Sequence, residues 1–445
     1  MHSVSGNCDL RRTTSFLERG GRRAYAAVLA GGLLLTGCQR PQYVQFGGYA
    51  QGGIWSVKAN LQGVREKPKS IQYHIEEILH EVDTTLSGYN KGSQLSRFNA
   101  GEPVEPSPMF LEVMEAAVRF WKETDGAVDC AAGPLFDIWG FGFKTDSLPS
   151  DDLVRQTMAR CGMARLVCSE NWPNSGTNSE KTDICSEKLP ISGTNYQESD
   201  VRGQKRGDLT SKNSKSVLGA FKQKARERIA GQDCKEELSG ISESLADGQC
   251  WGGLPLRDTT QPFTRRGEEN AGRAVLNYNA IAQGYSCDKV AEYLYSIGVK
   301  DMLVDIGEIF CDGLNPKGEP WRIGIDRPKD GNNTPGAELD GIWESDGAPH
   351  GVVTSGNYRK FYIKDGVKYS HTIDPRTGYP VQHNLLSATV IAPTALDADA
   401  YATYCMVIGF EAARDFILSR NDLEGCLIYG ADHIWTSPGF EKSKR

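Results

Sequence analysis

Residues 361–380 read FYIKDGVKYSHTIDPRTGYP and contain the clearest local pattern in this chain. An apolar run at 361–363 is followed by Lys364–Gly366, a tight-turn signal, and then by a second strand-like run over Val367–Ile373. This order predicts a β-hairpin. Because the rest of the chain carries long helical patterns, the mixture of hairpin strands and helices predicts an α+β fold rather than a doubly wound parallel sheet.

Helical periodicity occurs on both sides of this hairpin. Apolar residues recur at spacings of three and four, which is the pattern of amphipathic helices, and short apolar runs between them are typical of strands. The predicted helices span residues 71–86, 108–124, 285–297, 395–408 and 410–420. The predicted strands span residues 302–306, 321–325, 352–354, 386–391 and 426–429.

One long segment has a different composition. Residues 169–270 are rich in Ser, Asn, Gly, Lys, Glu and Asp and contain few aliphatic clusters. Such a segment buries too little apolar surface to offset the entropy cost of ordering it. We therefore predict one domain formed by residues 38–168 and 271–445, with a disordered or loosely packed insertion at 169–270. Within the insertion, only Val217–Ile229 has a helical pattern.

The composition excludes several classes of protein. The chain has 445 residues, of which 39% are hydrophobic and 24% charged, and these values are typical of globular proteins rather than collagen-like or wholly disordered chains. With 57 acidic and 50 basic residues the net charge is -7, so we expect no nucleic-acid partner, and any phosphate ligand needs a local binding device. The 12 cysteines show no Cys-x-x-Cys spacing, which disfavours a zinc ribbon or a thioredoxin-like site.

The amino terminus resembles an export signal. A pair of arginines precedes the apolar run Ala24–Leu35, which is too short to span a bilayer. The run ends in Leu-Thr-Gly-Cys, and small residues before Cys38 resemble the lipobox of bacterial lipoproteins. This predicts a signal peptide at 1–37, an acylated Cys38 and a lipid-anchored protein of the cell envelope whose domain faces the periplasm. The alternatives are an ordinary secretory signal or a buried amphipathic helix.

The polar part of the opening stretch, residues 369–380, bends through Asp-Pro and Thr-Gly dipeptides after a strand, a common place for binding loops. His371 can act as a base near neutral pH. Arg376 has a planar fork suited either to phosphate oxygens or to a paired hydrogen bond with Asp374. The alternative is a structural turn in which these three side chains satisfy one another.

A second cluster opens the helix predicted at 395–408. Asp399 and Thr403 are four residues apart and share one helix face, so their oxygens can converge on one point. Hard oxygen ligands suit Mg²⁺, which keeps water or substrate phosphate in its other positions. Asp397 can cap the helix or support that site. The alternative is simple N-capping and first-turn charge complementarity.

Three further stretches have polar or small residues that a ligand could contact. Asn277–Tyr285 is an amide-rich loop entering a helix, and Gly284 permits close approach. Tyr89, after the helix at 71–86, offers an aromatic face for a flat ring, although it could equally belong to the core. Gly126–Asp129 leads into the small-residue stretch 133–142.

Taken together and in this order, these stretches resemble the ApbE family, the FAD:protein FMN transferases. The resemblance covers nearly all of the mature chain outside 169–270. It implies an ApbE-like α+β domain of the tunnelling-fold-like type. The motifs that carry it are LSRFN at 95–99, GPL at 133–135 with WGFG at 139–142, AIAQGY at 280–285, TSGNY at 354–358 and HTIDPRTG at 371–378.

The resemblance also implies a reaction and its site. The family takes FAD, uses Mg²⁺, moves FMN onto a Thr or Ser hydroxyl of a partner protein through a phosphoester bond, and releases AMP. Its usual acceptors are subunits of membrane redox complexes and other periplasmic flavoproteins. By that analogy His371 is the base, and Asp399, Thr403 and the carbonyl of Ala280 hold the metal. The flavin and adenine pockets would be lined by Tyr89, Ala127, Val128, Asp129, Asn277, Gln283 and Ile373.

Two departures from the family pattern leave other functions open. Where many relatives have a Gly-Thr-x-Tyr type sequence, Gln51–Trp55 lacks the Thr, and Asn277 stands where Asp is frequent. One alternative is a Mg²⁺-dependent FAD pyrophosphatase in which water replaces the acceptor hydroxyl. The other is a lipid-anchored flavin-binding protein without turnover.

Overall fold

The computed structural model describes most of the chain between residues 42 and 442. The described ranges are 42–141, 148–167, 275–329, 332, 336–358, 361–364, 367–431 and 433–442. The predicted signal peptide, Cys38 and the insertion at 169–270 with its helical pattern at 217–229 lie outside them. Within these ranges no helix has both the length and the hydropathy that a membrane span requires.

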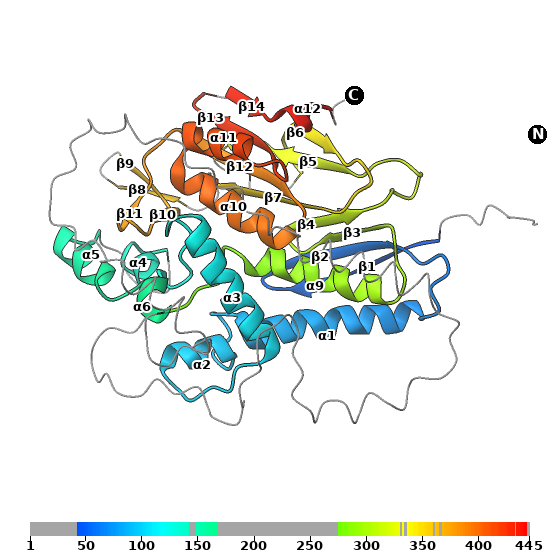
Figure 1. The fold of residues 1–445 in the computed structure, drawn as a ribbon, viewed down its shortest axis with the longest axis horizontal. Helices are drawn as coiled ribbons and strands as arrows, with labels where there is room; N and C mark the ends of the chain where they lie inside the picture. The colour runs from blue at the N-terminus through cyan, green and yellow to red at the C-terminus, as the bar shows by residue number, and fades with distance from the viewer. Residues whose placement is uncertain are drawn as a thin grey trace, which may run out of the picture. The chain divides into compact units, whose positions relative to one another are not determined.

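An eight-stranded sheet with antiparallel neighbours forms the centre of the described domain (Figure 1), in the order β1-β2-β3-β4-β7-β12-β13-β14. Its strands are β1 (Tyr43–Ala50), β2 (Gly53–Asn60), β3 (Met302–Asp305), β4 (Ile309–Asp312), β7 (His350–Gly356), β12 (Leu385–Ala392), β13 (Glu424–Tyr429) and β14 (His433–Thr436). Strands from both ends of the sequence therefore lie in one sheet.

Both faces of this sheet are covered, because successive side chains of a strand point to opposite faces. In β12, Val390 packs in the core under the helices, whereas Ile391 packs in a second core on the other face. That other face is covered by the hairpin of β5 (Arg322–Asp326) and β6 (Leu339–Glu344), which contributes Trp343. Near-continuous apolar runs such as β12 follow from burial on two sides.

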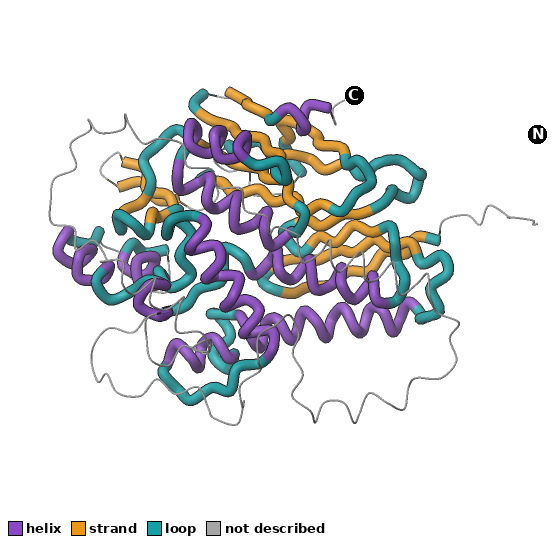
Figure 2. Tube along the Cα trace, in the orientation of Figure 1, coloured by secondary structure: helices purple, strands orange, loops and turns teal. Residues whose placement is uncertain are grey.

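The main helices cover the first face of the sheet (Figure 2). Their starts follow local rules: α3 and α10 are capped by the hydroxyls of Ser107 and Thr394, and α1 begins at Pro68. The long helices are α1 (Pro68–Leu86), α3 (Pro108–Glu123), α9 (Ala282–Ser296), α10 (Ala395–Ile408) and α11 (Phe410–Ser419). The short ones are α2 (Gln94–Ala100), α4 (Gly133–Ile138), α5 (Asp151–Met158), α6 (Met163–Val167) and α12 (Pro438–Lys442).

The hairpin predicted within residues 361–373 is present. Strands β8 (Phe361–Lys364) and β9 (Val367–Ser370) pair antiparallel, with Lys364 opposite Val367. The second predicted strand does not continue to Ile373 as one element, because the chain bends and forms a separate two-residue pairing of β10 (Ile373–Asp374) with β11 (Tyr379–Pro380).

The α+β prediction is confirmed, as are all five predicted helices to within three residues at each end. Several elements were not predicted, among them β1, β4, β6 and α5. These are short or glycine-containing, or have few apolar residues, so local periodicity does not mark them.

Candidate active site

The Asn277–Gly284 loop is folded by its own hydrogen bonds. The side-chain oxygen of Asn277 accepts from the N–H of Asn279 at 2.9 Å, and the carbonyl of Tyr278 accepts from the N–H of Ile281 at 3.0 Å. The N–H of Asn277 donates to the carbonyl of Cys130 at 2.7 Å, so this loop lies beside the loop that follows α3. Asn277 thus shapes the turn that carries Ala280 to the start of α9.

The first turn of α9 exchanges one of its own hydrogen bonds for a bond to α10. The Gly284 N–H, which in a continuing helix would donate to the carbonyl of Ala280, donates instead to Oδ2 of Asp399 at 3.1 Å. Within the described residues, the Ala280 carbonyl accepts no backbone N–H. A carbonyl oxygen and a carboxylate are therefore brought to the same helix end.

Gly284 makes this approach possible. A Cβ atom at this position would lie 2.3 Å from the carbonyl oxygen of Ala395 and 2.9 Å from the Cβ of Asp399. The backbones of α9 and α10 could not come this close with any larger residue. The predicted close approach at Gly284 is thus seen, and its partner is another helix of the chain.

Asp399 is buried, with only 5% of its surface exposed, and burial raises the pKa of its carboxyl to about 7, although the Gly284 N–H bond opposes this rise. Thr403 follows one turn later on α10 and is half-buried. A cation placed beside Asp399 would favour the charged carboxylate.

The oxygen donors of the predicted set have the chemistry of a hard-cation site. Ala280 offers a carbonyl that lacks a helical hydrogen bond, Asp399 a carboxylate, and Thr403 a hydroxyl one turn further along α10, and such donors suit Mg²⁺. No group of three or more His, Cys, Asp or Glu side chains able to hold a metal occurs in the described ranges. A metal site made only of those residue types is therefore not found there, and the mixed oxygen set of Ala280, Asp399 and Thr403 stays a prediction.

Asp397 has a different role from the cap considered for it. The hydroxyl of Thr394 caps α10 by accepting the Asp397 N–H at 3.0 Å. The Asp397 carboxylate accepts from Nη2 of Arg119 at 2.6 Å, which ties α10 to α3. The N-capping alternative therefore accounts for Thr394 but does not involve Asp399.

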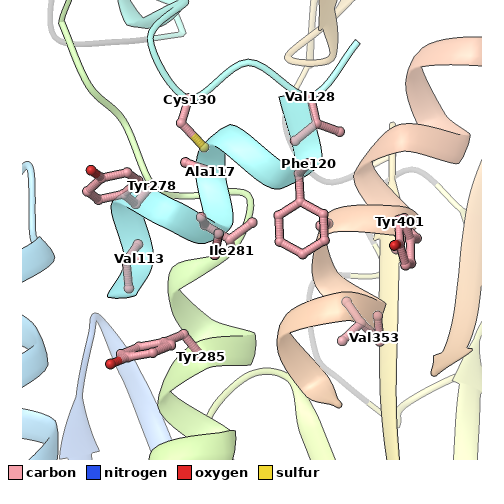
Figure 3. Close-up of a cluster of buried hydrophobic side chains, with 14 of the residues drawn as sticks. Val113, Ala117, Phe120, Val128, Cys130, Tyr278, Ile281, Tyr285, Val353 and Tyr401 are labelled. Atoms are coloured by element: carbon pink, nitrogen blue, oxygen red, sulfur yellow. The ribbon is translucent and has the colours of Figure 1, made fainter. Parts of the chain in front are cut away.

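The loop after α3 supplies the next predicted residues. Ala127 and Val128 are each 2% exposed, and Figure 3 shows Val128 among the buried apolar side chains of the core. The Asp129 carboxylate accepts from the N–H groups of Ala131 and Met163 at 2.7 and 3.0 Å, and burial raises its pKa to about 6. In the structure Asp129 thus holds the beginning of α6 against this loop.

Gln283 lies against the turn between β3 and β4. Its amide donates to the carbonyl of Ile306 at 3.4 Å, and a Cβ at Gly307 would lie 2.7 Å from its Nε2. Gly307 has a φ of 91°, which also favours glycine. Residue types and spacing did not point to this turn. The signal that could have found it is the Asp-Ile-Gly sequence at the end of β3.

The β1–β2 turn also reaches α9. Gln51 Nε2 donates to the hydroxyl of Ser286 at 2.6 Å, and that hydroxyl donates to the carbonyl of Ala282 at 2.7 Å. Gln51 begins the segment Gln51–Trp55, which lacks the Thr of the family pattern. Gln51 therefore lies beside the first turn of α9.

In the 369–380 loop, Asp374 and Arg376 bind each other, whereas His371 contacts another segment. Arg376 Nε and Nη2 each donate to the Asp374 carboxylate at 2.9 Å, so the fork of Arg376 is used within the loop. Ile373 is 2% exposed, and the ring of His371 lies 6.4 Å from that of Phe141. The structural alternative thus holds for Asp374 and Arg376, while His371 faces the end of the 133–142 stretch.

Trp139 holds that stretch in place. Its Nε1 donates to the carbonyl of Gly378 at 2.8 Å, and its ring stacks on Tyr369 at 5.9 Å between centroids.

Tyr89 is not part of the core, because 65% of its surface is exposed in the loop between α1 and α2. Its ring is therefore accessible to a ligand.

A hollow of about 430 Å³ lies outside these clusters, on the side of α1 and α9. None of the predicted site residues lines it. Its lining residues are His74, Glu77, Ile78, His80, Glu81, Thr84 and Tyr293.

The sequence profile of the ApbE family matches residues 51–188 and 239–427. This chain belongs to the ApbE family. The family match is interrupted at residues 189–238, inside the predicted insertion.

Relatives of this ApbE-family chain share the name FAD:protein FMN transferase. This chain is 28% identical to the FAD:protein FMN transferase of Vibrio cholerae over 396 residues, covering 87% of this chain and 89% of that one. It is also 28% identical to the FAD:protein FMN transferase of Escherichia coli K12, covering 93% and 95%. The structure of flavin transferase ApbE from Vibrio cholerae superposes with a TM-score of 0.58 at 26% identity, covering 91% of this chain and 99% of that one.

Proposed function

We propose that this chain transfers the FMN part of FAD to a Thr or Ser hydroxyl of an acceptor protein, with Mg²⁺, and releases AMP. Its relatives named FAD:protein FMN transferase match it over most of their length, which supports flavin transfer. The observation that carries the proposal is the Gly284 N–H bonded to Asp399, which leaves the Ala280 carbonyl without its helical partner.

Three groups would hold the metal: the Ala280 carbonyl, the Asp399 carboxylate and the Thr403 hydroxyl. When bound there, Mg²⁺ would neutralise pyrophosphate charge and polarise the phosphorus under attack. A chain with a net charge of -7 needs such a local device to bind FAD. Asp399 and Thr403 lie on the rigid helix α10, and Ala280 lies just before the start of α9, which packs closely against it.

His371 would act as the base. A hydroxyl with a pKa far above 7 attacks slowly unless a neighbouring group accepts its proton. In the proposed step the acceptor hydroxyl loses its proton to His371, and its oxygen forms a bond to the phosphorus of the FMN half. The bond from that phosphorus to the AMP oxygen breaks, and AMP leaves.

The remaining predicted residues would contact FAD. The exposed ring of Tyr89 offers a stacking face, and Gln283 offers an amide beside the β3–β4 turn. The backbone of the Ala127–Asp129 loop and that of Asn277 lie together through the Cys130 hydrogen bond, and Ile373 contributes an apolar contact.

The test uses three peptides that differ only in carrying Thr, Ser or Ala at one position. Purified protein is incubated with each peptide, FAD and Mg²⁺, and flavin fluorescence on the peptide and released AMP are both measured. Adduct and AMP in equal amounts, with Thr or Ser but not with Ala, support transfer. Equal amounts of AMP and free FMN without adduct indicate a pyrophosphatase. FAD that stays intact in the presence of the metal contradicts both reactions and favours a flavin-binding protein.

We also propose that an acylated Cys38 anchors the domain to a membrane of the cell envelope, facing the periplasm. The proposal rests on the apolar run Ala24–Leu35 and the Leu-Thr-Gly-Cys sequence that follows it. The full chain expressed in a bacterium and labelled with a palmitate analogue should carry the label in the membrane fraction. The Cys38→Ser variant should lose the label, and label retained in that variant would refute the anchor.

A further inference from the structure

A second buried carboxylate joins α9 to α10. Asp288 is 8% exposed, and its Oδ1 and Oδ2 accept from the N–H groups of Ala395 and Leu396, each at 2.9 Å. These N–H groups belong to the first turn of α10 and have no partner within that helix. Both oxygens of Asp288 are therefore engaged by the end of the neighbouring helix.

The two helices hold each other reciprocally. α9 contributes Asp288 to the amino end of α10, and α10 contributes Asp399 to the amino end of α9 through the Gly284 N–H at 3.1 Å. Asp288 and Gly284 are four residues apart on α9, and Ala395 and Asp399 are four residues apart on α10. Two contacts spaced by one turn on each helix fix their rotation and their sliding relative to each other.

Asp288 completes the cap of α10 from a different helix. The hydroxyl of Thr394 already caps α10 by accepting the Asp397 N–H at 3.0 Å. Asp288 reaches α10 from another helix, across 107 residues of sequence. Its effect is to connect the two elements that carry the proposed metal-binding groups.

We propose that Asp288 is a positioning residue for the metal site: by holding the Ala395 and Leu396 N–H groups, it keeps the Asp399 carboxylate in register with the Ala280 carbonyl. This inference rests on the proposed function. Each oxygen of Asp288 accepts an N–H group of α10, so its proposed role is to hold that helix rather than to bind the metal. Groups that orient a metal ligand in this way commonly change metal affinity by about 10- to 100-fold when they are altered.

The test is metal affinity measured without turnover. Mn²⁺ is titrated into the protein, with and without FAD, and free Mn²⁺ is followed by electron paramagnetic resonance. We expect Asp288→Asn, which keeps one acceptor oxygen and places an NH₂ group against an N–H, to raise the Mn²⁺ Kd about tenfold or more. The KM for FAD at saturating Mg²⁺ should change much less than the Mg²⁺ requirement.

The matched control is Asp312→Asn. Asp312 is also a buried carboxylate, 3% exposed, and accepts from the hydroxyl of Tyr295 at 2.7 Å at the end of β4. Its variant should lower stability without changing Mn²⁺ affinity. Asp288→Glu, which keeps the carboxyl group and both oxygens on a longer stem, is a second variant and should lose less affinity than Asp288→Asn.

The outcomes separate this inference from the proposed function. Unchanged Mn²⁺ affinity in Asp288→Asn, together with a lowered melting temperature, would mean that Asp288 is only structural and would overturn the inference. If the unaltered protein binds no Mn²⁺, or if Asp399→Ala binds it equally well, the proposed metal site itself is wrong. Weakened binding in the Asp288 variants, with normal binding in Asp312→Asn, supports the inference.

Discussion

Asp399 combines burial with a role that needs a negative charge. Its raised pKa of about 7 means that the folded, metal-free protein holds the proton more tightly than the unfolded chain does. The stabilisation from this proton is complete at low pH and is lost as the pH rises through about 7. A bound cation would displace the proton, so metal binding and deprotonation are coupled.

We therefore expect Mg²⁺ affinity to depend on pH. Below pH 7 the affinity should fall about tenfold per pH unit, and above it the affinity should become constant, because one proton must leave before the metal binds. Calorimetric titration with Mg²⁺ between pH 5.5 and 8.5 measures this directly. A flat profile in the unaltered protein would contradict the assignment of Asp399, and Asp399→Asn should bind weakly at every pH.

His371 is expected to act on the rate and not on FAD binding. The His371→Ala variant should lose about 10²- to 10⁴-fold in the rate of adduct formation, the usual contribution of a positioned base. Its Kd for FAD, measured by fluorescence quenching, should change little. The control is His80→Ala, because His80 is exposed on α1. Equal activity of His371→Ala and His80→Ala would remove His371 from the mechanism.

Between elements, the contact of α9 with α10 depends on one glycine. In Gly284→Ala the new methyl group would overlap the Ala395 carbonyl, so the helices must separate. We expect a loss of about 1–3 kcal/mol in the free energy of unfolding, as for other overpacked cores, and a lower Mg²⁺ affinity. Urea denaturation monitored by circular dichroism measures the first effect.

Gly341→Ala is the matched control for this variant. A Cβ at Gly341, in β6, meets no atom within 4 Å, and its backbone does not need positive φ. This variant should therefore leave stability and metal affinity nearly unchanged. If Gly284→Ala were equally neutral, the close approach of the helices would not be as tight as described.

For the chain as a whole, one segment falls outside the family match. The match continues on both sides of residues 189–238 and omits them. We expect a variant in which a short Gly-Ser linker replaces these residues to fold and to keep its transfer rate within about threefold, because the entropy cost of closing a loop depends only weakly on its length. Thermal unfolding and the peptide assay check this. Loss of transfer with normal folding would show that the segment contributes to the site.

Much of the architecture was predictable from local patterns. The helices 71–86 and 395–408 and the hairpin around Lys364–Val367 depend on residue spacing and turn chemistry, which act over a few neighbours. The motif order that resembled the ApbE family likewise required no coordinates. By contrast, β2 could not be placed beside β3, because nothing in its sequence specifies a partner some 245 residues away.

The site shows the same division more sharply. Residue types and spacing pointed to Asp399, Thr403 and the Asn277–Gly284 loop, because a shared helix face is a local property. They could not show that the Gly284 N–H donates to the Asp399 carboxylate, that Arg119 pairs with Asp397, or that the Asp288 carboxyl accepts N–H groups of α10. Each of these contacts joins residues more than 100 positions apart. Such contacts follow from how the helices pack on the sheet, and packing depends on the shape and burial of the whole chain rather than on any short segment of it.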